Sequence, residues 1–256
     1  MIKEESRFVP SSVMEGIVSF RAVIAGIESG ISDRKITRVM YDTERAGKHA
    51  GELSYIKAMS YKHDFEVEGV GSGKIDAVAV GSSHGGIITL CSDRTIPALK
   101  QSDLPENGFF MLLDGIEDPY NFGYALRSIA AAGADGVILP ERNWMSAAGV
   151  VCRASAGASE TLPLYVCEPA TASAVFRSAG YKVVCADIKN SVPMWEADLS
   201  RPLLLTVGGE KRGISKALLL NADSVVRIDY GRETGVSLSA ASASSILAFE
   251  VLRQNK

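Results

Sequence analysis

The sequence has few of the residues that build metal centres and disulfide frameworks. Its 256 residues include only four cysteines, at positions 91, 152, 167 and 185, and three histidines, at positions 49, 63 and 84. No two cysteines have C-x-x-C spacing and the histidines do not cluster, so the pattern predicts neither a zinc site nor any other metal site. We expect four reduced thiols, as is typical of cytoplasmic proteins.

Long apolar runs and a strong charge of one sign are also missing. No segment approaches the roughly 18 apolar residues of a membrane-spanning helix, and the opening stretch MIKEESRFVP is polar where a signal peptide is apolar. We therefore expect no membrane contact and a cytoplasmic location. The formal net charge is only −3, and acidic and basic residues are nearly balanced on both sides of residue 105. Any RNA-binding surface must then be a local feature.

The C-terminal part of the sequence alternates apolar runs of strand length with helical stretches. This alternation predicts an α/β fold whose parallel sheet is covered by helices on both faces. The expected strands are FFMLLDG, GVILP, LPLYV, YKVVCADI, PLLLTVGG and SVVRIDY. The expected helices cover residues 121–133, about 145–155, 170–179, 214–221 and 238–254.

The N-terminal part predicts a smaller α/β domain. Residues 11–30 have helical periodicity, with serines able to cap the start and Gly30 to end it. ITRVMYD and GGIITLCSD read as strands, and a second helical stretch covers residues 44–64. Pro, Asn and Gly in SDLPENG mark a linker, so we expect one domain at 1–103 and another at 109–256.

Three of the predicted C-terminal strands end in polar or glycine-rich loops. These loops are IEDPYNFG, EKRGIS and GRETGVSLS, which follow FFMLLDG, PLLLTVGG and SVVRIDY. Parallel sheets bind ligands at the carboxyl ends of their strands, so the loops predict one shared pocket. GGEKRG has neither the dinucleotide-binding nor the triphosphate-binding glycine pattern. Glycines that serve only the packing of this loop are the alternative interpretation.

Taken together, three segments resemble the motifs of the SpoU (TrmH-like) RNA ribose 2′-O-methyltransferases, in the family's order and close to its spacing. They are DGIEDPYNFGYALRSIAAAG, TVGGEKRGIS and RIDYGRETGVSLSAASASSILAFE. The N-terminal part is similar to the small RNA substrate-binding domain that precedes many of these enzymes. The resemblance implies a SPOUT-like trefoil knot in the C-terminal domain, S-adenosylmethionine as cofactor, a homodimer and a structured RNA substrate, ribosomal or transfer RNA. The two-domain layout favours ribosomal RNA.

The resemblance also implies roles for four residues in catalysis. Arg127 would contact the target nucleotide and stabilise the developing oxyanion, since a guanidinium is a poor base. Asn121 would form part of the site wall, Glu210 would order its loop, and Ser237 matches a motif serine. The plain alternatives are a surface arginine, a helix N-cap for Asn121, and a solvated loop charge for Glu210.

Cofactor-binding and RNA-binding positions follow from the same resemblance and from local charge. The expected cofactor-binding positions are Thr206, Val207, Gly208, Gly209, Gly213, Ile228 and Leu238. Phosphate contacts are expected from the basic cluster in SDRKITR, which contains Arg34, Lys35 and Arg38, and Ser239 is expected to contact the substrate.

The third motif departs from the family's common pattern. Ser239 stands where an asparagine is usual, Asp229 and Tyr230 replace a Pro-Met pair, and the loop is one residue longer. This departure leaves open a second hypothesis, a catalytically silent RNA-binding homodimer with the same fold. A nucleotide-hydrolysing or nicotinamide enzyme is a third, and it lacks its phosphate-binding loop.

Overall fold

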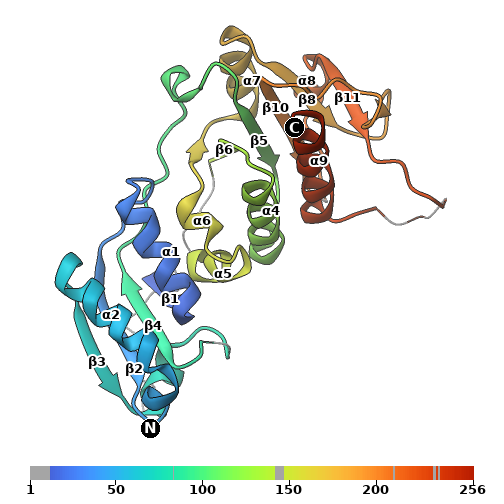
Figure 1. Cartoon of the computed structure of the whole chain (residues 1–256). Coiled ribbons are helices and arrows are strands. Elements are labelled where there is room, and N and C mark those ends of the chain that lie inside the picture. Colours follow the sequence, from blue (N-terminus) through green and yellow to red (C-terminus); the bar gives the residue numbers. More distant parts are fainter. Residues whose placement is uncertain (1–11, 83, 142–146, 210, 233–234, 236) are drawn as a thin grey trace. The chain divides into compact units, whose positions relative to one another are not determined.

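The computed structural model describes residues 12–82, 84–141, 147–209, 211–232, 235 and 237–256 (Figure 1). The chain divides into two units. Unit 1 contains Met1–Thr95 and Asn143–Thr161, and unit 2 contains Ile96–Arg142 and Leu162–Lys256. This division differs from the predicted domain 109–256, because the described residues 147–161 belong to the unit that contains the N-terminal residues.

Unit 2 is built on a seven-stranded parallel sheet, as the alternating pattern predicts. Its strand order is β7-β6-β5-β10-β8-β11-β9. The strands are β5 (Phe109–Asp114), β6 (Gly136–Leu139), β7 (Leu164–Val166), β8 (Lys182–Ala186), β9 (Val192–Pro193), β10 (Leu203–Gly208) and β11 (Ser224–Arg227). Only the two-residue strand β9 has no counterpart among the predicted strands, because two residues are too few to show a periodicity.

Both faces of this sheet are covered. Phe110 in β5 packs against Phe176 of α7 (Pro169–Ser178), with ring centroids 5.1 Å apart. Neighbouring residues of a strand point to opposite faces, and Met111 is fully buried as well. The remaining helices of the unit are α4 (Pro119–Ala131), α8 (Lys216–Leu220) and α9 (Ala240–Gln254). Helix α9 packs along α4 and contacts β10 (Figure 1).

Unit 1 contains a four-stranded mixed sheet with the order β1-β4-β2-β3. Its strands are β1 (Val13–Glu15), β2 (Ile36–Asp42), β3 (Glu66–Val70) and β4 (Ile87–Cys91), and its helices are α1 (Gly16–Glu28), the 3₁₀ turn η2 (Ala46–His49), α2 (Ala50–His63) and α3 (Ser72–Val78). The sequence predicts α1, β2, α2 and β4. It misses β3, in which only Val70 is fully buried, so the apolar pattern that marks a strand is absent.

The predicted start of α1 is wrong and its predicted end is confirmed. Ser12 precedes β1, and the N-cap of α1 is Glu15, which makes no side-chain capping bond. After the helix, Gly30 has φ +74° and donates its N–H to the carbonyl of Ile27 at 3.1 Å. A positive φ of this kind is one that glycine adopts without strain.

The segment 143–161 contributes α5 (Ala148–Ala154) and α6 (Ala158–Thr161) to unit 1. These helices approach α1 very closely. A Cβ atom on Gly157 would lie 2.3 Å from the Cβ of Ala22, and one on Gly26 would lie 2.4 Å from the carbonyl oxygen of Glu160. Glycine at both positions therefore allows the backbones to meet.

Among the described residues, no helix combines the length and the apolar character that crossing a bilayer requires.

Candidate active site

The first two motif loops leave the sheet side by side. Strands β5 and β10 pair in parallel, and their last residues, Asp114 and Gly208, are register partners. The N–H of Gly209 donates to the carbonyl of Asp114 at 2.7 Å. Further along the loops, Lys211 Nζ lies 2.7 Å from Glu117 Oε2. The loops that the sequence predicts to share one edge of the sheet do so.

Glycines give the second motif loop its shape. A Cβ atom on Gly209 would lie 2.0 Å from the carbonyl oxygen of Gly115, and one on Gly208 would lie 2.4 Å from the carbonyl carbon of Gly213. Gly213 has φ +61° and donates its N–H to Gly209 O at 3.0 Å. The close packing of the two loops therefore requires these glycines, whatever ligand the site holds.

A cavity of about 550 Å³ lies at the carboxyl end of β11. It is lined by Ile228, Asp229, Tyr230, Gly231, Arg232, Ser237, Leu238 and Ile246. Strand β8 separates β10 from β11, and its Cys185 is the register partner of both Thr206 and Val225. Since neighbouring strands lie about 4.8 Å apart, the ends of β10 and β11 are separated by about 10 Å at the same edge of the sheet.

The residues that depart from the family pattern have contacts of their own. The hydroxyl of Tyr230 accepts the N–H of Leu238 at 3.0 Å, which closes the long third loop across its base. Asp229 accepts a hydrogen bond from Arg227, whose Nε lies 2.6 Å from its Oδ1. Tyr230 therefore fixes the backbone of a residue that the sequence assigns to cofactor binding.

Helix α4 carries the first motif, and its N-cap is Asp118, not Asn121. Asp118 Oδ1 accepts the N–H of Asn121 at 2.8 Å, and Pro119 is the first helical residue. Pro is favoured at this position because its missing N–H has no helical partner to lose. The alternative that Asn121 caps the helix is therefore wrong, and Asn121 lies in the first turn.

Of the predicted catalytic residues Arg127 and Glu210, the structure describes only Arg127. Arg127 is exposed on α4, next to Ser128, whose Oγ accepts a hydrogen bond from Ser245 Oγ of α9 at 2.7 Å. This contact fixes the stretch of α4 that carries Arg127 against α9. Glu210 lies outside the described residues.

Ser239 and the buried strand residues have structural roles. Ser239 Oγ accepts the N–H of Ser242 at 3.2 Å and so caps α9, which begins at Ala240, two residues after the expected start. Thr206 and Val207 are 0% and 3% exposed within β10, and their backbones pair with β5. Their side chains support the sheet and are not among the residues that line the cavity.

Comparison with known proteins decides the family. Residues 108–249 match the model of the SpoU rRNA Methylase family, and they include all three motif loops. The chain belongs to this family. A Staphylococcus saprophyticus protein, named for TrmH family tRNA/rRNA methyltransferases, is 30% identical over 246 residues that cover 93% of this chain and 95% of that protein.

Further relatives of this SpoU-family chain agree with the match. The 23S rRNA (guanosine-2′-O-)-methyltransferase RlmB of Shewanella oneidensis is 31% identical over 190 residues, which cover 71% of this chain and 76% of that enzyme. The crystal structure of an AdoMet-bound rRNA methyltransferase from Sinorhizobium meliloti superposes with a TM-score of 0.74 over 94% of this chain and 86% of that chain, at 24% identity. At this identity the superposition shows the shared fold.

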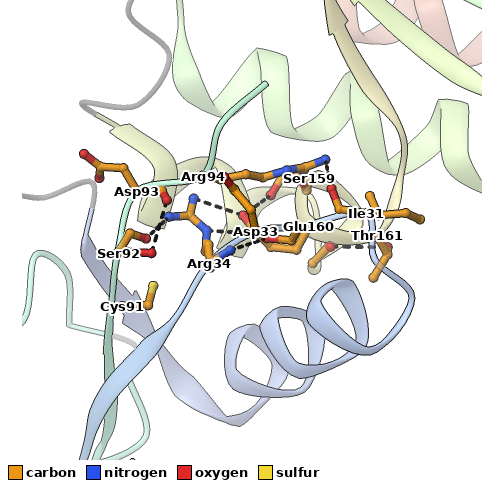
Figure 2. Close-up of polar contacts among 12 residues, drawn as sticks. Ile31, Asp33, Arg34, Cys91, Ser92, Asp93, Arg94, Ser159, Glu160 and Thr161 are labelled. Carbon is orange, nitrogen blue, oxygen red and sulfur yellow. Dashed lines mark hydrogen bonds and ion pairs between the residues drawn. The ribbon is translucent and has the colours of Figure 1, made fainter. Parts of the chain in front are cut away.

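In unit 1 of this SpoU-family chain, Arg34 has to be removed from the predicted RNA-contacting residues. Its side chain is 1% exposed and forms a bidentate ion pair with Glu160, with Nε 2.8 Å from Oε2 and Nη2 3.3 Å from Oε1 (Figure 2). Its third nitrogen donates to the carbonyl of Ser92 at 2.7 Å. A buried guanidinium whose three nitrogens all bond inside the fold is not available to an RNA phosphate.

The other two residues of this basic cluster differ from each other. Arg38 lies between two carboxylates, 2.9 Å from Glu66 Oε2 and 3.1 Å from Glu68 Oε2, which compensate its charge. Lys35 is exposed. Of the three residues, it is the one whose charge faces solvent with no carboxylate partner among the residues that the structure describes.

The described residues also contain no group of three or more His, Cys, Asp or Glu side chains placed to hold a metal ion.

Proposed function

We propose that this SpoU-family chain transfers a methyl group from S-adenosylmethionine to a ribose 2′-hydroxyl of RNA. The observation that carries the proposal is the pairing of Asp114 with Gly208 at one edge of the sheet, where the cavity at the end of β11 also opens. Ligands bind at this edge in parallel α/β sheets. Residues of the third motif line this cavity, and the first two motif loops leave the same edge of the sheet.

The cavity suits a cofactor of nucleoside size. Its volume of about 550 Å³ lies within the range of small-molecule sites, about 300 to 1,000 Å³. Ile228, Leu238 and Ile246 supply apolar wall, and the backbone of the Gly208 loop supplies polar groups nearby. We assign Ile228, Leu238 and Gly208 to cofactor binding. When bound, S-adenosylmethionine supplies an electrophilic methyl group, so the chain's own task is to hold and orient the acceptor.

Arg127 is the residue that we assign to the acceptor nucleotide. It is exposed and it lies on a helix fixed against α9. A guanidinium binds a phosphate with two parallel N–H donors and stabilises negative charge that develops on a nearby oxygen. Asn121 and Ser237 are proposed to line the acceptor side of the site, and positioning of the hydroxyl supplies most of the rate.

We also propose that the chain forms a homodimer through α4 and α9 and that its C-terminal domain contains a trefoil knot. Tyr120 and Tyr124 are one helical turn apart on α4 and are 47% and 50% exposed, and Phe249 on the neighbouring α9 is 47% exposed. Large apolar side chains exposed on two packed helices favour a second copy as their partner. Sedimentation of Phe249→Glu, with weaker association expected, tests the dimer.

Ribosomal RNA is the proposed substrate, since the Shewanella relative is named as a 23S rRNA enzyme. The test is the transfer of tritiated methyl groups from S-adenosylmethionine to ribosomal and transfer RNA from cells that lack the gene. We expect incorporation into ribosomal RNA at ribose 2′-oxygens. Incorporation only into transfer RNA would correct the substrate and keep the reaction.

Arg127→Ala is expected to lower kcat about 100-fold or more with unchanged cofactor affinity, because a transition-state contact is lost. Arg177→Ala is the matched control. It removes another half-exposed arginine of unit 2, on α7, which pairs with Asp223, and it should keep full activity. Tight cofactor binding without methyl transfer to any of these RNAs would contradict the proposal and support the silent RNA-binding homodimer.

A further inference from the structure

Unit 1 contains a cavity that is separate from the proposed methyl-transfer site. Its volume is about 320 Å³. It is formed by the first turn of α1, the start of α2, the loop before β4 and the end of α5. Its walls therefore come both from N-terminal residues and from the segment 143–161, which lies within the part of the chain that matches the family model.

One wall of the cavity is a buried carboxylate whose bonds are already committed. Glu15 is 5% exposed, and its Oε1 accepts the N–H groups of Val80 and Gly81 at 2.5 and 2.7 Å. Its Oε2 pairs with Arg153. The charge of Arg153 is thus compensated within the fold, so this arginine, the one that the described residues contribute to the wall, offers little net attraction to an anion.

His49 and a second carboxylate, Glu52, supply the groups that can still bind a ligand. His84 is 6% exposed and both of its ring nitrogens have partners, since Nδ1 accepts the N–H of Gly86 at 3.1 Å and Nε2 lies 3.3 Å from Asp76 Oδ1. His49 Nδ1 lies 2.5 Å from Glu52 Oε2. The side chain of Glu52 is 31% exposed, and a carboxylate with two oxygens can accept further N–H donors.

The charge and the shape of the cavity select the class of ligand. With the arginine paired and Glu52 unneutralised by a permanent cation, a phosphate or carboxylate is disfavoured. Ile17, Ile87 and Ala156 give the cavity apolar surface, and its volume lies at the lower end of the range for small-molecule sites, about 300 Å³. A flat, neutral group with N–H donors on its edge meets these conditions.

We propose that this cavity binds an unpaired nucleobase of the RNA substrate. Proteins read single-stranded RNA in this way, by splaying out a base, covering its faces and bonding its edge. In this arrangement the Glu52 carboxylate accepts N–H groups from the base edge, and the apolar residues cover a face of the ring. The inference rests on the proposed function, because it takes RNA as the substrate.

A bulky side chain at the rim tests the proposal without disturbing the core. Val18 lines the cavity and is 54% exposed, so Val18→Trp fills space at the opening while the buried residues stay unchanged. Ala25→Trp is the matched control, because Ala25 is exposed on the same face of α1 two turns further on and does not line the cavity. Both proteins should unfold at the wild-type temperature.

We expect Val18→Trp to weaken the binding of unmodified ribosomal RNA about 10-fold or more, and Ala25→Trp to bind it as the wild type does. Glu52→Gln, which keeps the shape and removes an acceptor, should weaken RNA binding by a smaller factor. The KM for RNA should rise in both cavity variants, while kcat and the affinity for S-adenosylmethionine stay unchanged. Wild-type RNA affinity in Val18→Trp would overturn the proposal.

Photocrosslinking locates the base directly. RNA that carries 4-thiouridine or 6-thioguanosine is irradiated with the full-length protein, and crosslinks are expected in peptides that contain residues 15–19, 49–52 or 84–87. Crosslinks confined to other parts of the chain contradict the cavity as a base site. RNA binding is measured without turnover. A protein that binds RNA through this cavity but transfers no methyl group would therefore contradict the proposed function and still support this inference.

Discussion

A buried ion pair in unit 1 contrasts with an exposed ion pair in unit 2. In unit 1 the Arg34–Glu160 pair is 1% and 2% exposed and joins segments that are 126 residues apart. In unit 2 the Lys211–Glu117 pair also joins two distant loops, but its side chains are 79% and 44% exposed. There the close backbone packing of Gly209 on Gly115 determines the loop geometry. The buried ion pair therefore stabilises the fold of unit 1. In unit 2 backbone contacts determine the loop geometry, so the exposed charges remain available to bind ligands.

Removal of the buried carboxylate should have the largest effect on stability. Glu160→Ala leaves Arg34 without its carboxylate partner and removes one of the opposite charges near Arg94. Breaking one half of a buried pair costs about 3 to 5 kcal/mol, since an uncompensated charge remains in the interior. We expect a loss of this size in the free energy of unfolding by urea. A double variant, Arg34→Met with Glu160→Leu, should recover most of it.

Cysteine labelling can show whether this loss is confined to unit 1. Burial raises the pKa of Cys91 to about 11 and that of Cys152 to about 12 in unit 1, and it raises the pKa of Cys185 to about 11 in unit 2. Thiolates are the reactive form, so all three thiols should react slowly at pH 8 in the folded protein. In Glu160→Ala, Cys91 and Cys152 should be labelled faster while Cys185 stays protected. Equally faster labelling of all three cysteines would mean that the loss of stability is not confined to unit 1.

Gly209→Ala should weaken cofactor binding more than any change of a surface charge. The added Cβ would lie 2.0 Å from the carbonyl oxygen of Gly115, so the first two motif loops must separate. We expect the affinity for S-adenosylmethionine, measured by calorimetry, to fall at least about 10-fold. Gly231→Ala is the control, since Gly231 lines the cavity at the end of β11 and has open space at its Cβ position. Equal affinities in both variants would show that the close contact is unimportant.

The same contrast explains what the sequence could predict. The strands of unit 2 are apolar runs bounded by loops, a local pattern, so both the parallel sheet and the meeting of the Asp114 and Gly208 loops follow from it. Arg34 reads as a surface cation because its neighbours in sequence are polar and its partner, Glu160, is distant in the chain. Pairing between distant segments leaves no local signal, and the same reason hides the grouping of residues 143–161 with unit 1.

The cap of α4 shows a smaller limit of the same kind. Asp118 and Asn121 are both residue types that favour N-caps, so residue type does not identify the cap, and the alternative of Asn121 as the cap is wrong. The structure assigns it to Asp118, whose position just before Pro119 lets its carboxylate reach the N–H of Asn121. Local propensity predicts the existence of a cap, and the backbone path selects the residue.

Tyr230→Phe tests how far side chains assist the backbone in unit 2. The change removes the hydroxyl that accepts the Leu238 N–H and keeps the ring. A single hydrogen bond at a half-exposed site contributes about 0.5 to 1.5 kcal/mol, so the affinity for S-adenosylmethionine should fall about 2-fold to 10-fold. Tyr61→Phe is the control, because Tyr61 is 90% exposed in unit 1 and should have no effect. An unchanged affinity for S-adenosylmethionine in Tyr230→Phe would mean that the hydroxyl does not contribute and that the glycines determine the geometry of the site.

The smallest effect is expected from the exposed pair. Lys211→Ala should change the free energy of unfolding by less than about 1 kcal/mol, because water already solvates both charges. This change in stability should become smaller still in 1 M salt, where the screening length is about 3 Å. The loss of stability in Glu160→Ala should persist in 1 M salt, because the charge of Arg34 is buried and salt ions do not reach it. Double-mutant cycles on Lys211 with Glu117 and on Arg34 with Glu160, measured at low and high salt, compare the two pairs directly. A Lys211–Glu117 coupling as large and as salt-resistant as that of Arg34 with Glu160 would show that burial does not separate the two units, and the contrast between them would have to be abandoned.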